Sequence, residues 1–124
     1  QYIYQLKDAR LLNMLSAEGK GVSRLQKPDK IYLENTNLSF ALKGKPDVGN
    51  VRETFVLNQL LNAGKDVSSP TEGDFYLDGL TVEVGGRNKG SSQVRHLDNY
   101  IVAADDIETG AGNKVPIWLF GFLY

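Results

Sequence analysis

The clearest alternation of hydrophobic and polar residues lies between residues 73 and 85. Two short runs there, rich in aromatic and β-branched residues, flank Asp78-Gly79, a dipeptide that accepts the positive φ angles of a tight hairpin turn. Because side chains alternate between the two faces of a strand, the pattern predicts a hairpin with one wholly apolar face. With the turn at these two residues, the opposite face places Asp74 directly across from Glu83.

Two carboxylates that face each other in this way repel unless something lies between them. The Cβ atoms of directly facing residues are about 5 Å apart, and unneutralised like charges at this spacing are destabilising. We therefore expect a cation side chain, a shared proton or a divalent metal ion between Asp74 and Glu83. A third carboxylate, Glu53, shares one row with Leu57 and Leu60 at the edge of an expected apolar helix face. Glu53 could join the pair, or it could cap its helix and extend to solvent.

The remaining pattern predicts a mixed α/β (α+β) chain. Apolar residues three and four apart indicate helices, and short apolar runs between turn residues indicate strands. The expected helices cover 2–9, one or two turns within 35–42, 48–62 and 91–97. The expected strands cover 11–15, then either 22–25 or 30–33, an edge strand at 65–67, the hairpin, and 100–104. A linker is expected at 43–47, and the apolar residues 115–124 are expected to pack on their own domain or on a partner.

The composition limits the classes of function. A chain of 124 residues suffices for one domain, or for one small domain with a fragment of a neighbour. The formal net charge of -1 argues against a strongly basic surface that would hold a nucleic-acid backbone unaided. No apolar run approaches the roughly 20 residues that span a bilayer, so no membrane association is expected. The absence of cysteine fits a reducing cytoplasm, and the start at Gln1 without methionine leads us to expect an excised part of a longer protein.

A glycine-rich basic loop follows the hairpin. Residues 85–92, GGRNKGSS, have two glycines at P-loop spacing, but the residue after Gly90 is Ser91, where a Walker A motif has lysine. ATP binding by this chain is therefore not expected. Because the loop leads into an expected helix, backbone amides at its start would suit contacts to phosphate, together with Arg87 and Lys89. The alternative is a solvated basic loop.

Several segments resemble one family. They are KPDKIYLENTNLSFAL (27–42), GNVRETFVLNQL (49–60), GDFYLDG (73–79), EVGGRNKG (83–90) and NKVPIWLFGFLY (113–124). With them the chain resembles the C-terminal domain of unknown function of many bacterial and archaeal AAA-type ATPases, a domain similar to PD-(D/E)XK nucleases. The resemblance implies a restriction-endonuclease-like core of helix, three-strand meander, helix and strand over 47–124. It also implies a winged-helix-like remnant, a helix plus a wing hairpin, over 1–46, and an upstream ATPase domain of the same protein as partner.

The resemblance also implies roles for the acids. In PD-(D/E)XK enzymes an Asp and a Glu bind a divalent metal; Asp74 and Glu83 correspond to them, and Glu53 corresponds to a helix carboxylate often found beside them. Oxygen ligands of this kind suit Mg²⁺. The lysine that assists the water in such enzymes lies two residues after the Glu, and this position is Gly85. Lys89, from the following loop, is the residue that could replace it.

Because Gly85 has no side chain to donate a charge, the sequence favours a domain that does not cleave. It would serve an AAA-type ATPase in protein interaction or nucleic-acid docking. The alternative is a Mg²⁺-dependent phosphodiesterase that acts on DNA or RNA through the three acids, with Lys89 as the displaced cation. A retained acid pair held by Arg52 or Arg87 is a further alternative.

Overall fold

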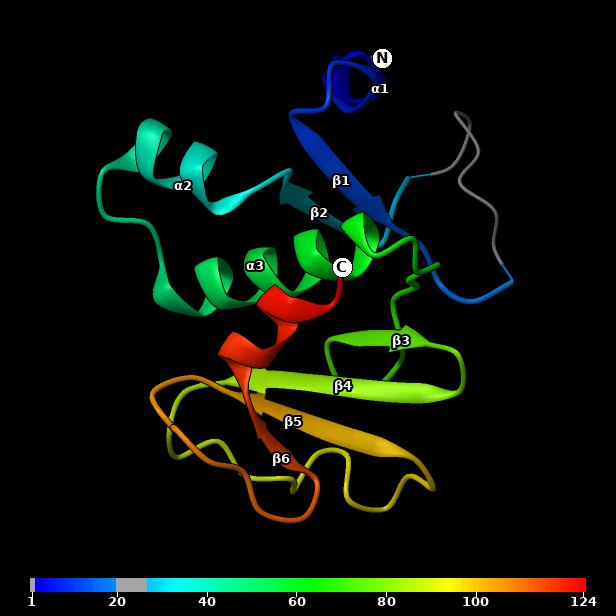
Figure 1. Ribbon diagram of the computed structural model, residues 1–124. Helices are drawn as coiled ribbons and strands as arrows, with labels where there is room; N and C mark the ends of the chain where they lie inside the picture. Colours follow the sequence, from blue (N-terminus) through cyan, green and yellow to red (C-terminus); the bar gives the residue numbers. More distant parts are fainter. Residues whose placement is uncertain (1, 20–26) are drawn as a thin grey trace.

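The computed structural model describes residues 2–19 and 27–124, which form a mixed α+β fold (Figure 1). The helices are α1 (Tyr2–Asp8), α2 (Thr36–Lys43), α3 (Val48–Asn62) and the short 3-10 helix η1 (Ile117–Phe122). The strands are β1 (Leu12–Leu15), β2 (Lys30–Leu33), β3 (Phe75–Leu77), β4 (Leu80–Gly85), β5 (Tyr100–Ala104) and β6 (Lys114–Pro116). None of the helices in this described part of the chain combines the length and the apolar character needed to cross a membrane.

The first part of the chain is a helix followed by a two-stranded hairpin. β1 and β2 pair antiparallel, with Leu15 opposite Lys30. β2 is thus one of the two strand positions that the sequence allowed; the other, 22–25, lies outside the described residues. The next helix, α2, starts at a side-chain cap, because the Asn35 side chain accepts a hydrogen bond of 3.2 Å from the amide of Leu38.

The central hairpin forms as predicted. Asp78 and Gly79 have φ angles of 49° and 79°, and the turn they make sets Phe75 opposite Val82. A two-residue turn of this type fixes the register of both strands. The apolar side chains of the hairpin therefore all point to one side of the sheet, the side that α3 covers.

The larger sheet has the order β3-β4-β5-β6, antiparallel between β3 and β4 and parallel in the other two pairs. The chain between β4 and β5 must therefore return along the sheet. The predicted helix at 91–97 is wrong, since this segment forms successive turns. The amides of Val94 and Leu97 bond three residues back, to the carbonyls of Ser91 and Val94, each at 2.9 Å, so the segment turns without continuing as a helix. Val94 anchors these turns: it is fully buried, and a Cβ on Gly73 would lie 3.3 Å from its Cγ1.

The predicted edge strand at 65–67 is also wrong. The chain here pairs with β3 only through an isolated bridge between Ser68 and Tyr76. Each of these residues donates its amide to the carbonyl of the other, at 2.9 and 3.0 Å. Residues 65–68 are therefore joined to the edge strand β3 by these two main-chain hydrogen bonds and form no strand of their own.

One hydrophobic core lies between α3 and the sheet. Its buried members include Val56, Leu57 and Leu60 of α3, Phe75, Leu77, Val82 and Val84 of the hairpin, Ile117 and Phe120 of η1, and Leu15 and Tyr32 of β1 and β2. In Figure 1, η1 lies between α3 and the sheet, and the expected packing of the apolar tail is confirmed for Ile117 and Phe120, which are both buried in the core. Trp118 and Phe122 instead stay exposed, with their rings in an edge contact at 6.1 Å.

Candidate functional site

Asp74 is positioned by the glycine before it. Gly73 has a φ of +88°, and a Cβ there would lie 2.6 Å from Cγ2 of Thr81, so only glycine allows this close approach to β4. The amide of Asp74 donates to the carbonyl of Val82 at 2.9 Å, just beyond the regular β3–β4 ladder. The Asp74 carboxylate accepts a hydrogen bond of 2.7 Å from the amide of Val84. These contacts hold the carboxylate against β4.

Glu83 is buried, with 3% of its surface exposed. Its Oε1 lies 2.9 Å from Nζ of Lys89, whereas its Oε2 is buried and has no hydrogen-bond partner among the described residues. Burial raises the pKa of Glu83, and the negative charge of Asp74 raises it further, although the Lys89 ammonium opposes the shift. A buried carboxylate oxygen without a partner is unfavourable. Oε2 is therefore a position where a proton or a cation would be stabilised.

Lys89 reaches Glu83 because Gly85 has no side chain. Gly85 is two residues after Glu83 on β4, so both residues belong to the same face of the sheet. A Cβ on Gly85 would lie 2.5 to 2.7 Å from Cγ, Cβ and Cδ of Lys89. The stem of Lys89 thus fills the space that a side chain at Gly85 would occupy. The cation that is missing at Gly85 in the sequence is supplied from the loop, four residues further along the chain.

The third carboxylate, Glu53 on α3, is held by β2. Its Oε1 accepts a hydrogen bond of 2.7 Å from the hydroxyl of Tyr32, and Nζ of Lys30 donates to the main-chain oxygen of Asp74 at 3.0 Å. The buried ring of Tyr32 packs on Phe75 with the centroids 5.7 Å apart. Burial, and then the contact with Glu53, raise the pKa of Tyr32 far above its ordinary value. Sequence reasoning missed both β2 residues, because alternation puts them on one face but does not say what this face meets.

Asp74 links the two glutamates. The pKa of Glu53 is raised, first by burial and then by the charge of Asp74, while Tyr32 and Lys30 oppose the shift. The negative charge of Asp74 thus raises the pKa of both glutamates. The three acids singled out in the sequence therefore influence one another through Asp74, whose charge acts on both Glu53 and Glu83.

This donor set suits Mg²⁺ in its chemistry. Mg²⁺ binds oxygen ligands and usually takes only one or two carboxylates, together with water and substrate phosphates. The partnerless Oε2 of Glu83 and the neighbouring carboxylate of Asp74 would supply such a pair. Within the ranges that the structure describes, no three His, Cys, Asp or Glu side chains are arranged to hold a metal ion by themselves. A metal would thus have two protein ligands here, and Glu53 would stand outside its coordination.

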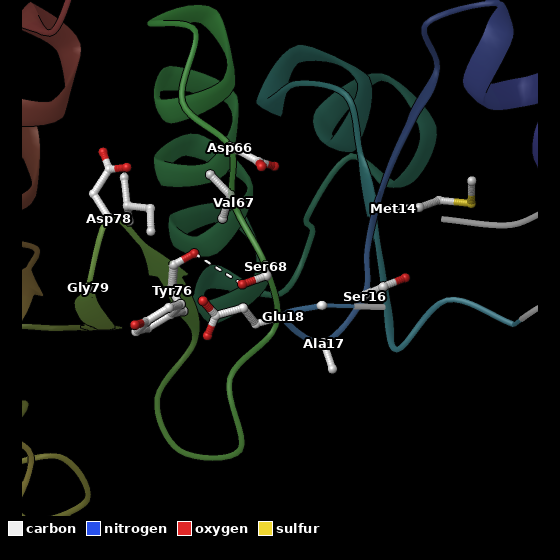
Figure 2. A pocket seen from close by; sticks show the side chains of 12 residues that line it. Met14, Ser16, Ala17, Glu18, Asp66, Val67, Ser68, Tyr76, Asp78 and Gly79 are labelled. Atoms are coloured by element: carbon white, nitrogen blue, oxygen red, sulfur yellow. Dashed lines mark hydrogen bonds between the residues drawn. The ribbon is translucent and has the colours of Figure 1, made fainter. Parts of the chain in front are cut away.

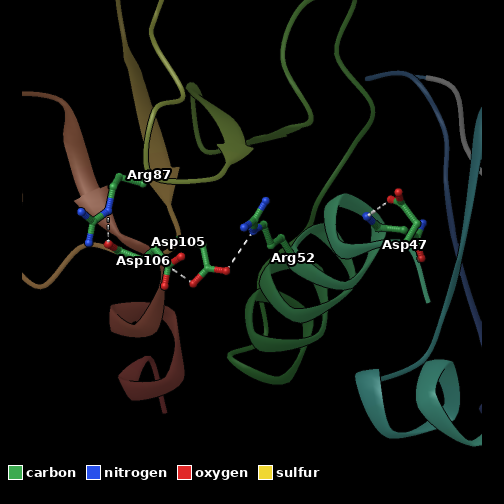
Figure 3. A network of polar contacts seen from close by, with 6 residues as sticks. Asp47, Arg52, Arg87, Asp105 and Asp106 are labelled. Atoms are coloured by element: carbon green, nitrogen blue, oxygen red, sulfur yellow. Dashed lines mark hydrogen bonds and ion pairs between the residues drawn. The ribbon is translucent and has the colours of Figure 1, made fainter. Parts of the chain in front are cut away.

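The two arginines considered as partners for the acids make other contacts (Figure 3). Nε of Arg52 lies 2.9 Å from Oδ2 of Asp105, and Nε of Arg87 donates to the main-chain oxygen of Asp106 at 3.1 Å. The expectation that Arg52 or Arg87 neutralises the acid pair is therefore wrong, because Lys89 takes this position. The arginine contacts instead fasten α3 and the glycine-rich loop to the end of β5.

A cavity of about 570 Å³ lies apart from the acids, between the end of β1, residues 66–68 and β3 (Figure 2). Glu18, Asp66 and Asp78 are on its walls, and the hydroxyl of Ser68 donates to the main-chain oxygen of Tyr76 at 3.4 Å. None of the three site acids lines this cavity. It is therefore not part of the candidate site.

Comparison with known proteins places the chain in no family. No family model matches it, and neither a curated protein nor a solved structure shows significant similarity to it.

Proposed function

We propose that this chain is a PD-(D/E)XK nuclease-like domain whose acidic site hydrolyses phosphodiester bonds of DNA or RNA with Mg²⁺. One observation carries the proposal: the ammonium of Lys89 lies 2.9 Å from Oε1 of Glu83, with its stem over Gly85. The sequence favoured a role without cleavage because Gly85 offers no cation. This objection no longer applies when Lys89 supplies the cation at the same acid.

The order of the elements supports the same class. α3, the β3–β4 hairpin and the parallel strand β5 follow one another in the order that a restriction-endonuclease-like core requires, but the third meander strand and the second helix expected for such a core are not formed by 65–67 and 91–97. The resemblance to C-terminal domains of AAA-type ATPases adds a partner to the proposal. This partner is an ATPase domain of the same protein, joined through a winged-helix-like unit to which α1, β1 and β2 belong.

The chain's own residues divide the work. Asp74 and Glu83 would provide the oxygen ligands for Mg²⁺. When bound, Mg²⁺ would stabilise negative charge on the phosphate and lower the pKa of a water molecule. Lys89 keeps its ammonium at Glu83 and has donors left for a phosphate oxygen. Glu53, held by Tyr32, would orient a water by accepting its hydrogen bond.

The test is a cleavage assay with metal. The purified chain is incubated with supercoiled plasmid DNA, and separately with labelled single-stranded RNA, in Mg²⁺, in Mn²⁺ and in EDTA. We expect cleavage of one substrate with metal and none in EDTA. Asp74→Asn and Lys89→Met should both abolish it, with circular dichroism showing that each variant is folded.

Lys65→Met is the matched control for Lys89→Met. It also removes one lysine, but Nζ of Lys65 lies 3.7 Å from Asp78 at the hairpin turn. This control should cleave like the parent. Cleavage by Asp74→Asn at the parental rate, or no cleavage by the parent on either substrate, would overturn the proposal.

A second candidate function is nucleic-acid docking without cleavage. The observation that favours it is that the ammonium of Lys89 neutralises the buried carboxylate of Glu83. This role predicts that a fluorescent oligonucleotide binds the parent equally in Mg²⁺ and in EDTA and stays intact. Metal-dependent cleavage by the parent that Asp74→Asn abolishes excludes it.

A further inference from the structure

A second cavity, of about 320 Å³, lies beside the acids over β5 and β6. Its polar lining residues are Asn88, Lys89, Ser91, Tyr100, Asn113 and Lys114. Lys89 therefore belongs to both places: its ammonium contacts Glu83, and its side chain forms a wall of this cavity. The glycine-rich loop singled out in the sequence forms the same wall.

The strand register puts Glu83 and Lys114 on one face of the sheet. Glu83 on β4 pairs with Val102 on β5, and Val102 pairs with Lys114 on β6. Residues aligned in this way across neighbouring strands point to the same side. Strands are about 4.8 Å apart, so the backbone of Lys114 lies about 10 Å from that of Glu83. An acid, an apolar residue and a base thus follow one another across the sheet.

The charge of this cavity differs from that of the acidic site. None of the described residues that line it is acidic, and two are lysines. A lysine ammonium has three donors. Nζ of Lys89 contacts Glu83, and Nζ of Lys114 donates to the main-chain oxygen of Arg87 at 2.6 Å, so each ammonium keeps donors for a ligand. The hydroxyls of Ser91 and Tyr100 and two side-chain amides add neutral donors.

We propose that this cavity binds a phosphate group of the polynucleotide, next to the phosphate that reacts at Asp74 and Glu83. The inference rests on the proposed function and adds the place where the polynucleotide is bound. Ammonium groups and hydroxyls without a carboxylate are suited to a phosphate, since charge-assisted hydrogen bonds to an anion are the strong ones. Ligand pockets range from about 300 to 1,000 Å³. A cavity at the lower end of this range has room for one phosphate with its sugar.

The experiment measures phosphate binding without metal. Inorganic phosphate is titrated into the ¹⁵N-labelled chain in EDTA, and amide shifts are followed by NMR. We expect the shifts to centre on Gly90, Ser91 and Lys114. Lys114→Gln should weaken binding by about tenfold, the effect of losing one hydrogen bond to a charged group. Lys65→Gln, which removes a lysine outside this cavity, should bind as the parent does.

Two further variants keep the result interpretable. Ser91→Ala removes one hydroxyl from the wall and should weaken phosphate binding even if Lys114→Gln proves unstable. Asp74→Asn should still bind phosphate, because the measurement needs neither metal nor cleavage. Equal affinity in the parent, Lys114→Gln and Ser91→Ala, or shifts centred elsewhere, would overturn the inference.

A last arm distinguishes a polynucleotide from free phosphate. A short single-stranded oligonucleotide should displace phosphate from the same amides of Asp74→Asn in EDTA; failure to displace it would overturn the inference. Phosphate and oligonucleotide binding without any cleavage by the parent would overturn the proposed hydrolysis and leave the binding site in place. Cleavage without phosphate binding would overturn the binding site and leave the proposed hydrolysis in place.

Discussion

The stem of Lys89 lies over Gly85, and its ammonium reaches Glu83 at 2.9 Å. The stem of Lys89 thus fills the space that is left because Gly85 has no side chain. In the sequence, a glycine at this position argues against chemistry at the acids. In the structure, the same glycine gives a lysine four residues later access to them.

The first prediction concerns the exchange of these two positions. Gly85→Ala should reduce cleavage, because the new Cβ would lie within 2.7 Å of the Lys89 stem and displace it. The double variant Gly85→Lys with Lys89→Gly places the lysine on β4 itself, and cleavage should return at least in part. Rates of plasmid or RNA cleavage measure both effects. A Gly85→Ala variant with the parental rate would show that the position of Lys89 does not matter.

The second prediction concerns stability. Lys89→Met leaves the charge of Glu83 buried without its partner. Removing one partner of a fully buried pair costs about 3–5 kcal/mol; since Lys89 is 31% exposed, we expect a loss of about 1–3 kcal/mol at pH 7. Urea denaturation measures it. Adding Glu83→Gln to Lys89→Met should recover most of the loss, and no recovery would contradict the account.

The third prediction concerns pH. The pKa of Glu83 is raised by burial and by Asp74, so the folded state binds this proton more tightly than the unfolded state does. The free energy of unfolding should therefore fall as the pH rises from the ordinary glutamate pKa through the raised value. Glu83→Gln removes this contribution, so its stability should depend less on pH over this range. Urea denaturation at several pH values compares the two, and identical slopes would contradict the prediction.

The fourth prediction concerns the contact between β2 and α3. Tyr32→Phe keeps the ring on Phe75 but removes the hydroxyl that donates to Glu53. We expect a loss of about 1.5–3 kcal/mol in the free energy of unfolding, the usual range for a hydrogen bond to a charged group. A double-mutant cycle with Glu53→Gln should give a coupling of about 1 kcal/mol. Additive effects of the two substitutions would show that this hydrogen bond contributes nothing.

The fifth prediction concerns metal binding. Mn²⁺ or Mg²⁺ should raise the melting temperature of the parent, because a ligand bound only by the folded state stabilises it, by about 2.7 kcal/mol at a hundred times the dissociation constant. Asp74→Ala should abolish the shift, and Asp66→Ala, outside the acidic cluster, should retain it. Equal shifts in the parent and in Asp74→Ala would place any bound metal elsewhere.

Much of the fold was predictable because it is encoded locally. The helix over Val48–Asn62 follows from its apolar spacing and from its cap, where the Asp47 side chain accepts from the amide of Asn50 at 2.8 Å. The hairpin follows from Asp78-Gly79, since a two-residue turn sets its own register. The helix predicted over 91–97 is wrong because the conformation of these residues depends on how the chain returns to β5. That path is a property of the whole sheet and not of the segment.

The sequence by itself determined which residue types the acidic site could use and that Asp74 and Glu83 would come close. These follow from strand alternation across a turn, where a few intervening residues fix the geometry. Only the tertiary structure decided that Lys89 reaches Glu83 and that Tyr32 holds Glu53. Both contacts depend on how a loop folds back or how distant elements pack, and the burial of a shared core sets such arrangements, which no local pattern encodes.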